Sequence, residues 1–198
     1  ICGSRAPGRA GVGEPMKLTA SRLAGLFLAH TSPVSDTRGA FARFYCEHEL
    51  GEALGARRIQ QINQTRTHLV GAIRGMHWQY PPHAEMKFVR CLRGRVWDVA
   101  VDLRRGSPTF LKWHAEELCP ENGLMMIIPE GCAHGFQVLE PDSELLYLHT
   151  ACYAPASEGG VRFDDPALAI DWPLPATELS ERDASHRSIS PDFEGIRL

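Results

Sequence analysis

The sequence predicts a mostly β protein, built as a sandwich or a barrel. Between residues 70 and 150, short runs of β-forming residues recur, and Gly or Pro separates them. In the run 95–103 the residues alternate, with apolar side chains at the odd positions from Trp97 to Leu103 and two carboxylates, Asp98 and Asp102, among the even ones. An alternation of period two indicates a strand with two different faces. Helical patterns are confined to two short segments, so short strands must supply the core.

The first part of the chain is expected to hold little regular structure. Residues 1–15 are rich in Gly, Pro and Arg without periodicity, and we expect a disordered extension, either a native one or a cloning remnant. A weak strand is expected within 17–30, a turn at 31–39 and a short strand at 40–45. The segment 47–58 predicts a helix, and the polar segment 60–67 predicts a strand.

The second part carries most of the predicted sheet. Its candidate strands are 87–92, 95–103, 110–118, 124–128, 135–139 and 144–150. The Pro-, Gly- and Asp-rich segment 155–175 is expected to be irregular. A short C-terminal helix is predicted at 177–185, with Ser180 near its start.

Composition excludes several classes of function. A chain of 198 residues can form one good core, and we expect a single domain over 16–198. The net charge of -3 gives no general attraction to nucleic acid or to a membrane surface, and no apolar run is long enough to cross a membrane. The six cysteines form no C-x-x-C pair, which argues against a zinc ribbon or a thioredoxin-type site. We expect buried thiols in a reducing, cytoplasmic compartment.

The segment 71–94 is the richest in chemistry. Cations and imidazoles crowd there, namely Arg74, His77, His83, Lys87 and Arg90. Cations suit an anionic substrate, and an imidazole can move a proton near neutral pH. Considered alone, His77 and His83 are equal candidates for that role.

A second motif, Gly-Leu-Met-Met-Ile-Ile-Pro-Glu-Gly-Cys-Ala-His over 123–134, has the spacing G-x5-P-x-G-x2-H. It resembles the second motif of the cupins, which are double-stranded β-helix or jelly-roll proteins. The alternative is a simple hairpin with a hydrogen-bonded His134. Most cupins bind a metal through an H-x-H pair, but the matching segment here is His77-Trp78-Gln79. We therefore expect no metal.

Longer motifs make the resemblance specific. They include Arg-Gly-Met-His-Trp-Gln (74–79), Pro-His-Ala (82–84), Lys-Phe-Val-Arg (87–90), Val-Trp-Asp-Val-Ala-Val-Asp-Leu-Arg (96–104), Ser-Pro-Thr-Phe (107–110), Ile-Pro-Glu-Gly (128–131), Ala-His-Gly-Phe (133–136) and Asp-Asp-Pro (164–166). From about Met16 to Ser185 the chain resembles the dTDP-4-dehydrorhamnose 3,5-epimerase family. The resemblance implies a homodimeric cupin without metal or other cofactor. Its substrate would be a nucleotide sugar, dTDP-4-dehydro-6-deoxy-D-glucose, epimerised at C3 and C5 on the route to dTDP-L-rhamnose.

The resemblance also implies the catalytic residues. His77 would be the base, Asp183 in Leu-Ser-Glu-Arg-Asp (179–183) would orient it, Lys87 would stabilise the enolate oxygen, and Tyr147 would be the acid on the opposite face. This division suits the chemistry, because inversion next to a ketone needs a base on one side of the carbon and an acid on the other. A fixed cation at the oxygen stabilises the transition state more than the ground state.

The remaining implied residues bind the substrate. Arg74 would pair with the diphosphate, for which a guanidinium offers two parallel contacts. The others are Arg38, Phe41, Gln61, Asn63, His134, Asp98 and Tyr153, some of them reaching the site from the partner subunit of a homodimer.

Several residues depart from the family pattern. Ala40 replaces a usual Phe, Arg43 a usual Glu and Leu148 a usual Lys, whereas the catalytic set is kept. Turnover is therefore expected, and three alternatives stay open. They are an epimerase acting at C3 or C5 only, a non-catalytic cupin that binds a small anion, and a metal-dependent cupin.

Structural alternatives also remain for the single residues. His77 and Tyr147 could be core residues with satisfied polar atoms. Lys87 could be a solvated residue at a sheet edge, and Asp183 a solvated residue on a helix.

Overall fold

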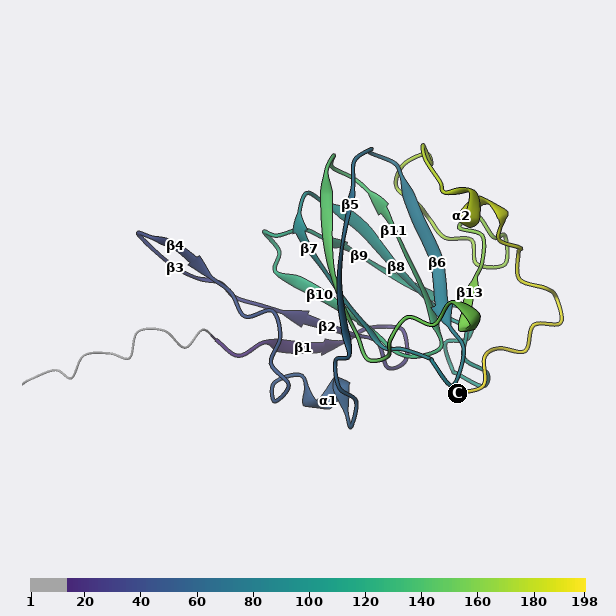
Figure 1. Cartoon of the computed structure of the whole chain (residues 1–198), viewed down its shortest axis with the longest axis horizontal. Helices are drawn as coiled ribbons and strands as arrows, with labels where there is room; N and C mark the ends of the chain where they lie inside the picture. Colours follow the sequence, from purple (N-terminus) through teal and green to yellow (C-terminus); the bar gives the residue numbers. More distant parts are fainter. Residues whose placement is uncertain (1–13) are drawn as a thin grey trace, which may run out of the picture.

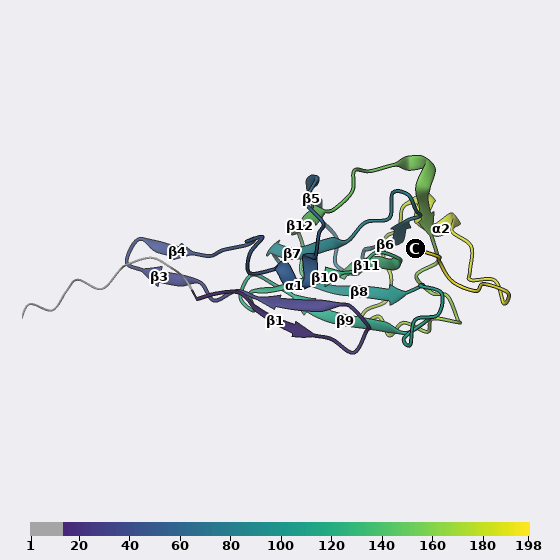
Figure 2. The same ribbon diagram turned by 90° about the horizontal axis from the view of Figure 1, so that it is seen from below.

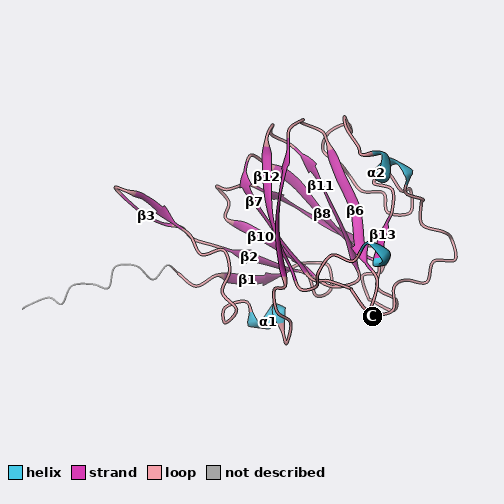
Figure 3. Ribbon diagram, in the orientation of Figure 1, coloured by secondary structure: helices cyan, strands magenta, loops and turns pink. Residues whose placement is uncertain are grey.

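Two packed antiparallel sheets form the body of the protein in our computed structural model, which describes residues 14–198 (Figures 1 and 3). The six-stranded sheet has the order β1 (Lys17–Ala20), β2 (Phe27–His30), β10 (Leu124–Ile128), β7 (Lys87–Arg93), β12 (Ser143–His149) and β5 (Gln61–Thr67). The five-stranded sheet has the order β13 (Glu158–Gly160), β6 (Ile73–Gln79), β11 (Cys132–Val138), β8 (Val96–Asp102) and β9 (Trp113–Leu118). The predicted mostly β sandwich or barrel is confirmed.

The N-terminal part holds more strands than predicted. The segment 17–30 contains two strands, β1 and β2, in place of one, and the expected turn and strand at 31–45 are a small hairpin of β3 (Val34–Asp36) and β4 (Gly39–Phe41). This hairpin stands away from the two main sheets (Figure 2). The predicted helix at 47–58 is only α1 (Gly51–Leu54), because Gly55 at its C-cap has a φ of 59°, which ends the helix. The prediction for residues 1–15 falls mainly on residues 1–13, outside the described part.

The later strands largely match the prediction, with β6 and β13 as the strands that were missed. Strand β6 was hard to see because its residues are mixed in character and Gly75 interrupts them. The structure explains this glycine: its φ is 120°, and a Cβ there would lie 2.6 Å from the Cα of Gly135 on β11. Strand β9 begins at Trp113 and not at residue 110, whereas β11 begins earlier than expected, at Cys132.

The C-terminal helix is α2 (Glu181–Ser185), shorter than the predicted 177–185. Ser180 caps its start, since the Ser180 hydroxyl accepts a hydrogen bond from the backbone N–H of Asp183 at 3.1 Å. A single-turn 3₁₀ helix, η1 (Pro155–Ser157), precedes β13 in the otherwise irregular segment.

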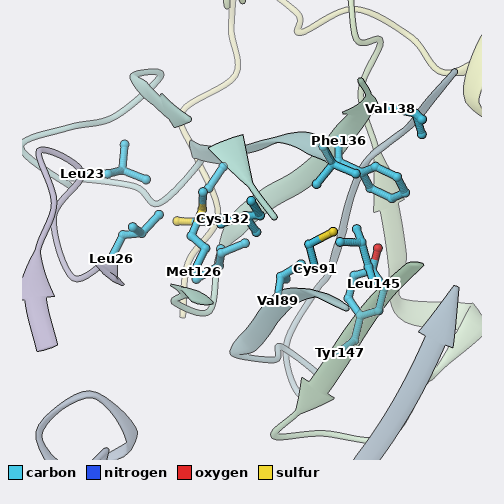
Figure 4. Packing of buried hydrophobic residues seen from close by; sticks show 14 of the residues in the cluster. Leu23, Leu26, Val89, Cys91, Met126, Cys132, Phe136, Val138, Leu145 and Tyr147 are labelled. Atoms are coloured by element: carbon cyan, nitrogen blue, oxygen red, sulfur yellow. The ribbon is translucent and has the colours of Figure 1, made fainter. Parts of the chain in front are cut away.

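The main core lies between the two sheets (Figure 4). Val89 and Tyr147 of the six-stranded sheet face Phe136 and Val138 of the five-stranded sheet there. Two further apolar clusters cover the outer faces of the sheets. In β8 the predicted alternation is confirmed, because the odd positions pack in the outer cluster while the buried Asp98 bonds inward to His134. No helix within residues 14–198 is long and apolar enough to cross a membrane.

Candidate active site

A cavity of about 520 Å³ lies between the two sheets and is closed on one side by the segment before α2. Both sheets contribute to its wall, and so does the C-terminal helix. Seven of the residues predicted from the sequence line it, namely Asn63, Arg74, His77, Lys87, His134, Tyr147 and Asp183. The structure therefore brings together all four predicted catalytic side chains.

The first functional pair in the cavity is His77 with Asp183. Their side chains meet at 2.8 Å between Nε2 and Oδ1, and the backbone N–H of Gly75 donates to Oδ2 of Asp183 at 3.0 Å. Asp183 is 3% exposed, so the alternative of a solvated aspartate is excluded. Burial opposes its ionisation, but the hydrogen bonds from His77 and Gly75 outweigh burial and lower the pKa of Asp183 far below its usual value. A carboxylate held in this way keeps the proton of His77 on Nε2 and leaves Nδ1 to act as a base.

Arg182 and His186 surround this pair. Arg182 lies 3.3 Å from the Asp183 carboxylate through Nε, and its Nη2 lies 3.2 Å from Nε2 of His77. The ring of His186 meets His77 edge-on, with centroids 5.5 Å apart. The potential ligand atoms of His77, Asp183 and His186 lie within 4.8 Å of one another, a spacing that a metal ion could use. The adjacent guanidinium disfavours a second cation there, and the absence of a metal stays a prediction.

The opposite wall of the cavity belongs to the six-stranded sheet. Tyr147 and His149 point to the same side of β12, and His149 is directly opposite Lys87 of β7. Lys87 is 8% exposed, which excludes a solvated edge lysine, and its Nζ donates to the backbone oxygen of His77 at 3.2 Å. Burial, and then the nearby Asp98 carboxylate, raise the pKa of Tyr147 well above its usual value. Tyr147 is therefore a protonated phenol in the neutral range, as an acid must be.

A buried pair, His134 and Asp98, lies behind Tyr147. Nε2 of His134 and Oδ1 of Asp98 are 2.8 Å apart, and the ring of His134 meets Tyr147 edge-on at 5.9 Å between centroids. The other carboxylate oxygen of Asp98 is buried and has no hydrogen-bond partner within the described residues. This pair places negative charge beside the phenol.

The predicted nucleotide residues divide into two groups. Arg74 lines the cavity near its outer rim, where its Nε donates to Thr67 at 2.9 Å, and Asn63 lines the cavity as well. Gln61 does not line it, and its side-chain oxygen accepts a hydrogen bond from the backbone N–H of the exposed Tyr153 at 3.0 Å.

The second group lies on the projecting hairpin. The side chain of Arg38 is 88% exposed and pairs with Asp36 of the same hairpin, and Phe41 is exposed as well. Neither lines the cavity of its own chain. His83, the other early candidate for proton transfer, is an exposed residue in the turn after β6 and does not line the cavity either.

Sequence reasoning missed two residues of the cavity region, Glu85 and His149. Nδ1 of His149 lies 2.8 Å from Oε2 of Glu85, and the same carboxylate lies 3.3 Å from Nζ of Lys87. The alternation of strand residues could have found His149, because it lies two positions after Tyr147 and so shares its face.

The class of protein follows from this arrangement. An imidazole of β6, paired with a buried carboxylate of α2, faces a protonated phenol and a buried lysine on the six-stranded sheet, across one cavity. Such a set moves protons on carbon next to a carbonyl and belongs to an acid–base isomerase.

Comparison with known proteins identifies the family. The family model for dTDP-4-dehydrorhamnose 3,5-epimerase matches residues 20–190. A dTDP-4-dehydrorhamnose 3,5-epimerase of Pseudomonas aeruginosa is 42% identical over 88% of this chain and 97% of its own. A dTDP-4-dehydrorhamnose 3-epimerase of Streptomyces niveus is 37% identical over 85% of this chain and 81% of its own. The chain belongs to the dTDP-4-dehydrorhamnose 3,5-epimerase family.

Solved structures of the family have the same fold. The crystal structure of the 3,5-epimerase from Elizabethkingia anophelis matches with a TM-score of 0.85 and 38% identity, over 91% of this chain and all of that one. A dTDP-6-deoxy-D-glucose-3,5-epimerase from Legionella pneumophila, solved in complex with dTDP-4-keto-L-rhamnose, matches with a TM-score of 0.83 and 38% identity, over 87% of this chain and 92% of that one.

Proposed function

We propose that the protein epimerises dTDP-4-dehydro-6-deoxy-D-glucose at C3 and C5, which yields the dTDP-L-rhamnose precursor. The observation that carries this proposal is the placement of the His77–Asp183 pair and Tyr147 on facing walls of one cavity. Family membership supports the substrate class, because the Legionella relative was solved with a dTDP-linked 4-keto sugar.

In the proposed mechanism, Nδ1 of His77 takes the proton from the carbon next to the 4-keto group. The electron pair of the broken C–H bond forms a double bond to the carbonyl carbon, and negative charge develops on the ketone oxygen. Lys87 supplies a fixed cation there. Tyr147 then gives its proton to the other face of the carbon, which inverts the centre. Asp183 stabilises the His77 imidazolium that forms, and Arg74 at the rim holds the diphosphate.

The proposal includes a homodimer in which each copy completes the nucleotide site of the other. Its support is the position of Arg38 and Phe41, which are exposed on a hairpin that projects from the body. In the proposed homodimer, these side chains would reach the cavity of the second copy. Sedimentation equilibrium should give twice the mass of one chain, and Arg38→Ala should weaken dTDP binding without changing that mass. An active monomer would contradict this part of the proposal.

We also propose one epimerase domain over 16–198 and a cytoplasmic location.

A second candidate function is epimerisation at C3 or C5 only. One comparison favours it: the Streptomyces niveus relative is a 3-epimerase at nearly the same identity as several 3,5-epimerases. The sequence adds a reason, because Leu148 departs from the family pattern next to the proposed acid.

Deuterium exchange separates these functions. The protein is incubated in D₂O with dTDP-4-dehydro-6-deoxy-D-glucose, and NMR measures deuterium at each carbon. We expect label at both C3 and C5, since one base and one acid can serve either carbon next to the ketone. Label at one carbon would establish the mono-epimerase. No label at either carbon, together with tight dTDP binding, would indicate a non-catalytic binding protein.

A further inference from the structure

The cavity contains a second imidazole–carboxylate pair that the mechanism above does not use. His149 is 9% exposed, and its Nδ1 lies 2.8 Å from Oε2 of Glu85, while its Nε2 lies 3.3 Å from the side-chain amide nitrogen of Asn63. The ring of His149 stacks on that of Tyr147, with 15° between the planes and 5.9 Å between the centroids. The pair therefore lies beside the proposed acid, on the wall opposite His77 and Asp183.

The proposed reaction needs a proton source at this wall. Each inversion adds a proton to His77 and removes one from Tyr147, so the two groups end in the wrong protonation states for the next inversion. Tyr147 is buried beside Asp98, and both features make its phenolate strongly basic. A donor beside Tyr147 would return this proton faster than solvent that has to reach a buried phenolate.

The surroundings of His149 suit that task. The groups that face it are Glu85 and Lys87 near β7, Tyr147 on its own strand, and Asn63 on β5. Burial opposes the ionisation of Glu85, but the hydrogen bond from His149 and the charge of Lys87 outweigh burial and lower its pKa. Glu85 is thus an anion in contact with Nδ1 of His149, as the Asp183 carboxylate is in contact with Nε2 of His77.

We propose that His149, held by Glu85, returns a proton to Tyr147 after each inversion. The imidazolium gives the proton of Nε2 through a cavity water to the phenolate oxygen, and a proton from solvent then restores the imidazolium. On the other wall, His77 releases the proton that it took from carbon to solvent, so the protons balance. The side-chain amide of Asn63 donates to Nε2 in the neutral form and can turn its oxygen to Nε2 in the charged form. This proposal rests on the proposed epimerase function, and His149 acts through Tyr147 without touching the reacting carbon.

A purely structural role is the alternative, because His149 also ties β12 to the segment before β7. The test compares His149→Gln and Glu85→Gln, which retain hydrogen-bonding groups, with wild type. Rapid quenching with enzyme in excess follows the first inversion, and steady-state assays follow later ones. We expect the first inversion at nearly the wild-type rate and a steady-state rate about 10²-fold lower for His149→Gln, in the usual range for a lost proton-transfer group. Added imidazole, a diffusible proton carrier, should restore part of the steady-state rate.

A surface variant supplies the matched control. His68→Gln removes another histidine that is paired with a carboxylate, Asp142, but whose exposed side chain does not line the cavity, and it should behave as wild type. An unchanged steady-state rate in His149→Gln would overturn the proposal. So would an equal slowing of the first inversion, or a loss that imidazole does not relieve. If the wild-type protein forms no product, the proposed function itself is wrong, whatever the variants do.

Discussion

His77→Asn is expected to lower the rate of epimerisation by about 10⁴-fold, at the upper end of what one acid–base group contributes. Asparagine can keep a hydrogen bond to Asp183, so the segment around α2 should stay in place. It cannot accept a proton from carbon, and the variant should lose deuterium exchange at both C3 and C5 together. The measurement is kcat with the 4-keto sugar, alongside NMR of the exchange in D₂O.

Binding supplies the control for this variant. The affinity for dTDP should stay close to that of wild type, because Arg74 and the rest of the rim are unchanged. Exchange at either carbon that survives in His77→Asn at the wild-type rate would show that another group is the base.

Asp183→Asn should lower kcat by about 10²-fold or more, since the neutral amide no longer stabilises the imidazolium or fixes the proton on Nε2.

The pKa of Asp183 also gives the sign of a pH effect. Its folded-state pKa is lowered, so its stabilising contribution is fully present above the unfolded value of about 3.9 and is lost only as the pH falls through the lower, folded value. Across the neutral range Asp183 therefore stays ionised. Loss of activity between pH 7 and pH 5 would therefore not report protonation of Asp183.

The sequence predicted the strands that carry the acid and the lysine for a simple physical reason. Residues that alternate along a strand face opposite sides, so the patterns of β7, β8 and β12 place Lys87, Asp98 and Tyr147 on known faces. The family resemblance predicted that these strands pack around one cavity, because no local pattern indicates which sheets face each other. The assembly of His77 with Asp183 was likewise a product of resemblance, since 106 residues separate them.

Three features were outside the reach of local patterns. Strand β6 contains Gly75, which the close approach of β6 to β11 requires. A glycine weakens the sequence pattern that predicts a strand. The pairing of His149 with Glu85 depends on the register between β12 and β7, which is fixed by the whole sheet. Arg38 and Phe41 are exposed on the β3–β4 hairpin, so packing within the chain does not indicate what these side chains bind.

Tyr147→Phe should separate exchange from inversion. The substitution removes the proton donor on one wall and leaves the ring packed in the core, while His77 and Asp183 on the other wall are unchanged. We expect the rate of inversion to fall by about 10²- to 10⁴-fold, as for other lost general acids. The base can still take the proton from carbon, and the enolate can still form against Lys87.

The proton taken by His77 then has only one way back, to the face from which it came. Since His77 is partly accessible in the cavity, its imidazolium can exchange with solvent first, and in D₂O the returned hydrogen is deuterium. The variant should therefore incorporate deuterium with retention of configuration, at a rate well above its residual inversion. A two-wall mechanism requires this result, because one base alone cannot invert a centre. Loss of exchange in parallel with loss of inversion would contradict it and would place Tyr147 in the deprotonation step itself.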